Sequence, residues 1–203
     1  MTKLLTLSQV EIQNIARAVH PLLEGVLSEY DYRKYPADIY LKSKESFASL
    51  QPTNQGISDA MLWKWGHWGK ENFPTHHKAL IAEIQLGWPL FVKSSECQNP
   101  KNTFVWWQTY LKRSTTYITS AFITHLIHHK ISLPIIDQHN YRAMNNLIAA
   151  QRPYFEYKKK PSKWEDIENL KHFMGAVSGY IDGISFSDFD KFLMMYGRGH
   201  VAR

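Results

Sequence analysis

Asp137 lies at a predicted helix start, where a carboxylate could take part in a reaction. Residues 133–143 read LPIIDQHNYRA, so two isoleucines lead directly into the acid, His139 follows two positions later and Arg142 five positions later. An Asp at a helix start is commonly a cap, whose carboxylate accepts hydrogen bonds from free backbone N–H groups. The same place keeps a carboxylate ionised and fixed, because the partial positive charge of the helix N-terminus stabilises an anion. Such a carboxylate can stabilise a developing cation or orient an attacking water.

Two cations, Lys112 and Arg113, come just before a second predicted helix start, at Ser114. The free N–H groups of a helix start bind phosphate, and adjacent Lys or Arg side chains add charge. We therefore expect these residues, together with Thr115, to hold a phosphate group. Three lysines at 158–160 form the only run of like charge, which fits a solvated loop and a contact with a polyanion equally well.

Aromatic and basic residues are interleaved in residues 63–70, which read WKWGHWGK. On a helix Trp65 and Trp68 share one face, whereas Trp63 points elsewhere. Such rings pack into a core more often than they bind a ligand, but tryptophans also form walls on which a nucleobase can stack. The candidates for a base pocket are Trp63, Trp65, Trp68, Gln55 and Asp59.

Helical patterns run through the chain and would position these residues. Ser8-Gln9-Val10-Glu11 and Ser162-Lys163-Trp164-Glu165 are typical capping boxes, and no hairpin turn lies between alternating strands. The segment 114–129 is apolar nearly all round, which predicts a helix at the centre of the fold. The predicted helices cover residues 8–26 with a kink at Pro21, 36–50, 58–69, 75 to a stop at Gly87-Trp88-Pro89, 100–111, 114–129, 137–150, 162–175 and 187–196. The sequence therefore predicts an all-α fold.

Composition narrows the class of protein. The 203 residues suffice for one large domain or two small interlocked ones, and the net charge of +6 favours a polyanionic partner. Cys97 is the only cysteine, which excludes internal disulfides, four-cysteine zinc sites and cysteine-ligated iron–sulfur clusters. The N-terminus has no apolar signal core, and no segment reaches the ~20 apolar residues of a membrane-spanning helix. We therefore expect a cytoplasmic protein, monomeric and without membrane contact.

Residues 112–150 resemble the catalytic motif of the helix-hairpin-helix DNA glycosylases, in which an apolar pair, an Asp and a His-x-x-Arg continuation follow a buried helix. The matching residues are Ile135, Ile136, Asp137, His139 and Arg142. The resemblance implies two interlocked helical subdomains with the active site in the cleft between them, and residues 100–150 as the core catalytic segment. It implies removal of a modified or damaged base from double-stranded DNA, without cofactor or metal. The DNA-binding candidates are then Lys112, Arg113, Ser114, Thr115, His139, Arg142, Lys158 and Lys159.

The chain departs from the family pattern in two places. It has no glycine between Gly87 and Gly175, so the family's glycine-rich hairpin is missing. It also has Ser114 where bifunctional members carry a nucleophilic lysine, which favours a monofunctional glycosylase with Asp137 as its catalytic residue. Lys112, two positions earlier, is the candidate for an additional lyase step. The excised base stays open between a modified cytosine, such as a glucosylated one in phage DNA, and 8-oxoguanine.

Three other interpretations stay open. A helical DNA-binding module without activity would share the charge and the fold but would need no carboxylate. A helical protein-interaction subunit would show no salt-dependent affinity for DNA. His125 and His129 lie four residues apart, a workable spacing for metal ligands on one helix face, although no His-Glu-x-x-His pattern accompanies them.

Overall fold

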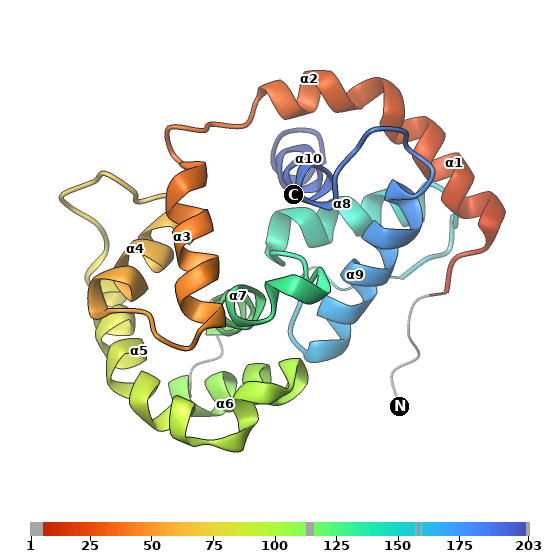
Figure 1. Ribbon diagram of the computed structural model, residues 1–203. Helices are drawn as coiled ribbons and strands as arrows, with labels where there is room; N and C mark the ends of the chain where they lie inside the picture. Colours follow the sequence, from red (N-terminus) through yellow and green to blue (C-terminus); the bar gives the residue numbers. More distant parts are fainter. Residues whose placement is uncertain (1–5, 113–115, 157, 159, 202–203) are drawn as a thin grey trace. The chain divides into compact units, whose positions relative to one another are not determined.

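The computed structural model describes residues 6–112, 116–156, 158 and 160–201, and in these residues the chain forms helices, turns and loops without a strand (Figure 1). The predicted all-α class is therefore confirmed for the described part of the chain. The chain divides into two compact units: Asp31–Leu133, called here the middle unit, and Met1–Tyr30 with Pro134–Arg203, called the terminal unit. This division falls inside residues 100–150, so the predicted catalytic segment contributes to both units. Among the described residues, no helix is both long enough and apolar enough to cross a membrane.

The helices of the terminal unit come from both ends of the chain. They are α1 (Gln9–Val19), α2 (Leu23–Ser28), α8 (Gln138–Ala149), α9 (Trp164–Ser178) and α10 (Phe186–Gly199). The predicted capping box is present at the start of α1, where the Glu11 carboxylate accepts a hydrogen bond from the Ser8 N–H at 2.7 Å. The predicted kink at Pro21 is confirmed, because the 3₁₀ turn His20–Leu22 separates α1 from α2.

Helices α8 and α10 pack with their backbones in close contact. A Cβ added to Gly197 on α10 would overlap the carbonyl group of His139 and lie 3.2 Å from the backbone nitrogen of Ala143. Glycine alone fits at this point, since every other residue carries a Cβ. The core of the unit includes Phe173 on α9 and Phe189 on α10, which stack at 6.3 Å between ring centroids. The close approach brings side chains of α10 to the start of α8.

Helix α9 begins one residue later than the predicted capping box. Ser162 was the expected cap and Glu165 its partner, whereas Lys163 is the N-cap and Asp166 is the capping acid. The Asp166 carboxylate accepts hydrogen bonds from the backbone N–H groups of Ser162 at 2.8 Å and Lys163 at 3.1 Å. The prediction of a helix was right and its register was wrong, because the buried Asp166, and not Glu165, meets the free N–H groups.

The middle unit is a continuous stretch of the chain. Its helices are α3 (Ala37–Ala48), α4 (Asn54–Lys64), α5 (Thr75–Lys93), α6 (Pro100–Leu111) and α7 (Tyr117–Ile127), with the short 3₁₀ turns Ser95–Gln98 and His129–Ile131. Ten of the eleven residues of α7 are buried. The prediction of a buried helix is therefore confirmed, and its nearly continuous apolar character agrees with this burial, because a helix buried on most sides needs no polar face.

Helix α4 is shorter than predicted. It ends at Lys64 and does not continue to residue 69, because Gly66 takes the left-handed conformation with φ 65°. The Gly66 N–H donates to the Trp63 carbonyl at 3.0 Å and the His67 N–H to the Leu62 carbonyl at 2.8 Å. These two bonds make a Schellman ending, in which a glycine satisfies the last carbonyl groups of the helix.

Helix α5 is longer than predicted. Gly87-Trp88-Pro89 was expected to stop it, but it continues through Pro89 to Lys93. A proline inside a helix removes one hydrogen bond and costs roughly 3 kcal/mol. The buried side chains of Trp88 and Phe91, on either side of Pro89, offset this cost. Gly87 serves packing, because a Cβ there would lie 2.5 Å from the ring of Tyr110.

Candidate active site

Asp137 is the N-cap of α8, as the sequence predicts. Its backbone is extended, with φ −144° and ψ −176°. Its Oδ1 accepts hydrogen bonds from the backbone N–H groups of His139 at 2.7 Å and Asn140 at 3.1 Å. The side chain is partly buried. A carboxylate in this place is stabilised as an anion by the helix N-terminus and cannot rotate without losing both hydrogen bonds.

Asn140 completes the cap from inside the terminal unit. Its side chain is 1% exposed, and its Oδ1 accepts a hydrogen bond from the Asp137 N–H at 2.8 Å. Its Nδ2 donates to the carbonyl of Ile135 at 2.6 Å and to Oδ1 of Asp190 at 3.1 Å. Asn140 therefore ties the residues on both sides of Ile136 to the first turn of α8.

Asp190 of α10 also reaches this segment. Its Oδ2 accepts a hydrogen bond from the Ile135 N–H at 3.2 Å, in addition to the bond from Asn140. Asp190 is not among the site residues predicted from the sequence. Its position 50 residues after Asn140 carries no local signal, and only the packing of α10 on α8 brings the two together. In the sequence, Asp190 is one of several charged residues of an ordinary amphipathic helix.

His139 and Arg142 lie on the first turns of α8, beside Asp137. Burial is the main cause that lowers the pKa of His139, and the charges of Arg142 and Arg198 act in the same direction, while Asp137 opposes them. His139 is therefore neutral at pH 7. Arg142 donates a hydrogen bond from Nη1 to the carbonyl of Gly197 at 3.1 Å. The structure thus places three of the predicted residues together at one end of α8, with Arg198 of α10 as a further cation.

The predicted phosphate-binding residues lie at the end of α6. Lys112 is exposed and ends this helix in the left-handed conformation, with φ 46° and ψ 23°. Arg113, Ser114 and Thr115 lie outside the described residues, and so does Lys159. Lys112 belongs to the middle unit and Asp137 to the terminal unit.

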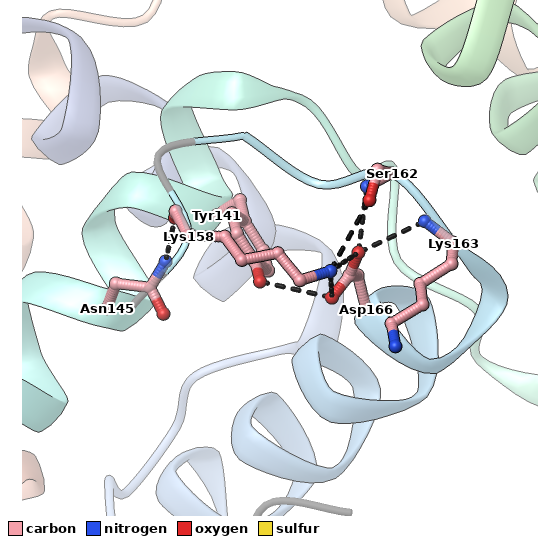
Figure 2. Close-up of polar contacts among 6 residues, drawn as sticks. All are labelled: Tyr141, Asn145, Lys158, Ser162, Lys163 and Asp166. Carbon is pink, nitrogen blue, oxygen red and sulfur yellow. Dashed lines mark hydrogen bonds and ion pairs between the residues drawn. The ribbon is translucent and has the colours of Figure 1, made fainter. Parts of the chain in front are cut away.

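Lys158 forms an ion pair inside the terminal unit. Its Nζ lies 2.9 Å from Oδ2 and 3.0 Å from Oδ1 of Asp166, whose carboxylate is buried (Figure 2). The Tyr141 hydroxyl donates to the same carboxylate at 3.1 Å, and burial, with the Asp166 charge as a further cause, raises the pKa of Tyr141. With the two backbone bonds at the start of α9, Asp166 holds the loop that carries Lys158 against α8 and α9.

Trp63 packs as a core residue of the middle unit. It is 6% exposed, its Nε1 donates to the carbonyl of Pro36 at 3.0 Å, and its ring stacks on Tyr40 at 4.8 Å and on Phe122 at 5.8 Å between centroids. These contacts leave little of its surface for a base. The core interpretation, the commoner one for a tryptophan at helical spacing, accounts for its contacts.

The other predicted pocket residues lie on the surface or partly buried. Trp65 and Trp68 follow the end of α4, so they do not share a helix face, and Trp65 stacks on His77 at 4.0 Å. Gln55 donates from Nε2 to Oδ1 of Asp59 at 2.7 Å, one turn along α4. The described contacts bring these two together as a surface pair and connect neither of them with the tryptophans.

Both ring nitrogens of His125 are engaged within the middle unit. Nδ1 lies 2.7 Å from the carbonyl of Leu133 and must donate to it, so Nε2, 2.6 Å from the Tyr40 hydroxyl, accepts. Burial is the main cause that lowers the pKa of His125 to about 3. His129 Nδ1 lies 3.1 Å from the carbonyl of Leu126. In the described ranges no group of three or more His, Cys, Asp or Glu side chains is arranged to hold a metal ion.

Comparison with protein families, with curated proteins and with solved structures finds no match to this chain. A function must therefore be argued from the residues themselves. The group formed by Asp137, Asn140, His139, Arg142 and Asp190 combines a fixed carboxylate, buried hydrogen bonds and two neighbouring arginines, Arg142 and Arg198. It is the arrangement among the described residues that best fits the chemistry expected from the sequence.

Proposed function

We propose that this protein is a DNA glycosylase that cleaves the N-glycosidic bond of a modified or damaged base, with Asp137 as its essential carboxylate. The observation that carries the proposal is the fixing of Asp137 at the start of α8, with Oδ1 bonded to two backbone N–H groups and the segment before it bonded to Asn140 and Asp190. The resemblance of residues 112–150 to the helix-hairpin-helix glycosylases agrees with this assignment. The net charge of +6 suits a DNA partner.

Cleavage of an N-glycosidic bond requires an ionised carboxylate that is held in place. As the bond between base and sugar breaks, positive charge develops on the deoxyribose, in an oxocarbenium-like transition state. An anion held near C1′ stabilises that charge without having to reorganise. Water then adds its oxygen to C1′, and the departing base takes up a proton, so an abasic sugar and a free base result. Because two backbone N–H groups hold Oδ1 of Asp137 in place, we assign to this carboxylate charge stabilisation in preference to proton abstraction.

The neighbours of Asp137 suit the backbone of a nucleic acid. Arg142 and Arg198 are cations that can bind phosphate, and the neutral ring of His139 lies beside them. A base that reacts must leave the duplex stack, so contacts that hold the flanking phosphates also help to hold the flipped nucleotide. Hydrolysis without a lyase step is the simpler form of the proposal, with Lys112 as the lysine to test if strand cleavage accompanies base release.

The test compares wild type with Asp137→Asn on a panel of DNA that carries uracil, 8-oxoguanine, alkylated bases, or hydroxymethylated and glucosylated cytosine. Asn caps a helix as well as Asp does, so this variant removes the charge and keeps α8. We expect wild type to leave alkali-labile abasic sites in one of these DNAs. The rate for Asp137→Asn should fall on the order of 10²–10³-fold, the usual effect of losing one electrostatic stabiliser of a transition state.

Asp182→Asn is the matched control, because it removes the same charge from an exposed position of the terminal unit. This control should release base at the wild-type rate. If wild type binds DNA but releases no base from any member of the panel, the protein is a DNA-binding module and the proposal is wrong. Strand breaks that form without alkali would add a lyase step, and the substrate that reacts would decide between modified cytosine and 8-oxoguanine.

A further inference from the structure

The chain segment that leads into Asp137 is held by side chains from two helices. Both backbone polar groups of Ile135 are bonded, its N–H to Asp190 and its carbonyl to Asn140. The N–H of Asp137 is bonded to Asn140 as well, and Asn140 is in turn bonded to Asp190. The backbone that leads into the cap of α8 is therefore held at two residues, Ile135 and Asp137, on either side of Ile136.

Asp190 is not needed to cap α8. The cap is complete with the Asp137 carboxylate and the Asn140 side chain, which together bond the free N–H groups of the first turn and the N–H of the cap residue. Asp190 instead bonds the peptide that precedes the cap, and it comes from α10, whose backbone touches α8 at Gly197. Its effect is to fix where the first residue of α8 lies relative to α10.

We propose that Asp190, acting through Asn140 and the Ile135 peptide, is a positioning residue that fixes the Asp137 carboxylate for base release. This inference rests on the proposed function and adds to it a residue on a distant part of the sequence. The physical reason is pre-organisation: a charge stabilises a transition state best when it is already in place, and a displacement of about 1 Å can cost 100-fold in rate. Catalytic groups keep such tolerances only when surrounding hydrogen bonds hold them.

The experiment uses the full chain and a DNA from the panel on which wild type acts. Asp190→Ala removes both acceptors, and Asp190→Asn keeps one carbonyl oxygen for the Ile135 N–H but presents an NH₂ group that competes with that of Asn140. At saturating enzyme in single-turnover conditions, we expect the rate of base release to fall about 100-fold for Asp190→Ala and about tenfold for Asp190→Asn. DNA affinity should stay within about twofold of wild type, because both carboxylate oxygens of Asp190 are bonded inside the protein and a carboxylate does not bind phosphate.

Asp188→Asn is the matched control. It removes a carboxylate from the same helix, one bonded to Ser185 and Lys191 at the start of α10, so it should not change the single-turnover rate. All rates are measured at a temperature at which circular dichroism shows each variant to be fully folded. A residue that served stability alone would then leave the rate per folded molecule unchanged.

A double variant provides a rescue. Asn140→Asp alone places two carboxylates next to each other, which repel. Asn140→Asp combined with Asp190→Asn restores one donor and one acceptor between positions 140 and 190. We expect the double variant to release base faster than Asn140→Asp alone, although Ile135 loses the donor for its carbonyl.

The outcomes separate the two claims. If wild type releases base and Asp190→Ala does so at the same rate, or if affinity falls in proportion to rate, the positioning role is wrong while the glycosylase stands. If wild type releases no base from any DNA, the proposed function fails and the role of Asp190 fails with it. A slower rate with unchanged affinity, together with rescue by the double variant, supports both.

Discussion

Two carboxylates stand at helix starts in the terminal unit, and their surroundings differ. Asp166, at the start of α9, is 3% exposed and accepts bonds from two backbone N–H groups, the Tyr141 hydroxyl and the Lys158 ammonium. Asp137, at the start of α8, is partly buried and uses one oxygen to accept two backbone bonds. Both are capping acids, and the buried carboxylate of Asp166 is paired with the exposed ammonium of Lys158.

The difference indicates what each acid contributes. A buried carboxylate that is paired with a lysine and bonded by a hydroxyl and two amides contributes to stability, because its removal leaves several polar groups without partners. A capping carboxylate that still meets solvent costs little in stability to replace and can meet a ligand. On the proposed function, one unit therefore uses an acid at one helix start for stability and an acid at another helix start for chemistry.

The largest expected effect is that substitutions of Asp166 and Asp137 have opposite relative effects on stability and on base release. Asp166→Ala should lower the free energy of unfolding by roughly 3 kcal/mol, since it leaves Tyr141 and two backbone N–H groups unbonded. Asp137→Ala should lower it by only about 1 kcal/mol, the usual effect of losing an N-cap. Base release should show the reverse order, with Asp137→Ala inactive and Asp166→Ala active while it is folded. Urea denaturation followed by circular dichroism, and the alkali assay, measure the two effects.

Asp166→Asn serves as the control for charge, because it keeps an oxygen for one backbone N–H and loses the ion pair. Its stability should lie between that of wild type and that of Asp166→Ala. An Asp166→Asn variant that folds normally and releases no base would contradict the comparison, since it would make Asp166 the chemical residue.

The sequence predicted the α8 site in part because capping is local. Asp137 and the first turn of α8 lie within four residues of one another, so the residue types report the hydrogen bonds directly. The same holds for the capping box at Ser8 and Glu11, and for the buried α7, whose lack of a polar face is visible in its residues. These features depend on residues that are close together in the chain, so the local sequence is sufficient to predict them.

The parts that were missed depend on contacts between distant residues. Asp190 meets Asn140 only because α10 approaches α8 closely, and the glycine that allows this approach, Gly197, looks like an ordinary helix end. Gly87 beside Tyr110 was likewise interpreted as a helix stop, although it makes room for a ring, and α5 continues past Pro89 because its buried side chains outweigh a missing hydrogen bond. Local propensity cannot report such tertiary contacts.

A smaller effect is expected for the lysines of the loop before α9. Lys158 and Lys160 are both exposed, and Lys158 is bonded to Asp166. Lys160→Ala should weaken DNA binding and reduce the dependence of log affinity on log salt by about 0.9, the contribution of one phosphate contact. Lys158→Ala should leave that slope unchanged and lower stability by less than about 1 kcal/mol, since its side chain is 43% exposed and solvent screens the pair.

Fluorescence anisotropy with a labelled duplex at several salt concentrations measures these slopes. Lys158→Ala with a reduced slope and unchanged stability would show that the ammonium leaves Asp166 to bind DNA. That result would weaken the contrast between the two helix starts, because Asp166 would then be part of the DNA-binding surface.

The smallest effect concerns a third capping carboxylate, Glu11 at the start of α1, which is partly buried and is paired with Arg152. The hydrogen bond from Arg152 is the main cause that lowers the pKa of Glu11 to about 2, and bonds from Ser8 add to it. Because the folded pKa lies below the ordinary value of 4.5, the ionised carboxylate stabilises the fold fully above about pH 4.5. That contribution is lost as the pH falls from there through 2.

Glu11→Gln should therefore be less stable than wild type at pH 7, and the difference should shrink between pH 4.5 and pH 2. Arg152→Gln should show the same pH dependence, and the double variant should lose no more than either single variant, as expected for one shared interaction. Urea denaturation at pH 7, 4, 3 and 2 measures the differences. If the difference in stability between Glu11→Gln and wild type stays constant over this range, the charge of Glu11 does not contribute to stability. Glu11 would then act as a neutral cap does, unlike the charged and ion-paired Asp166.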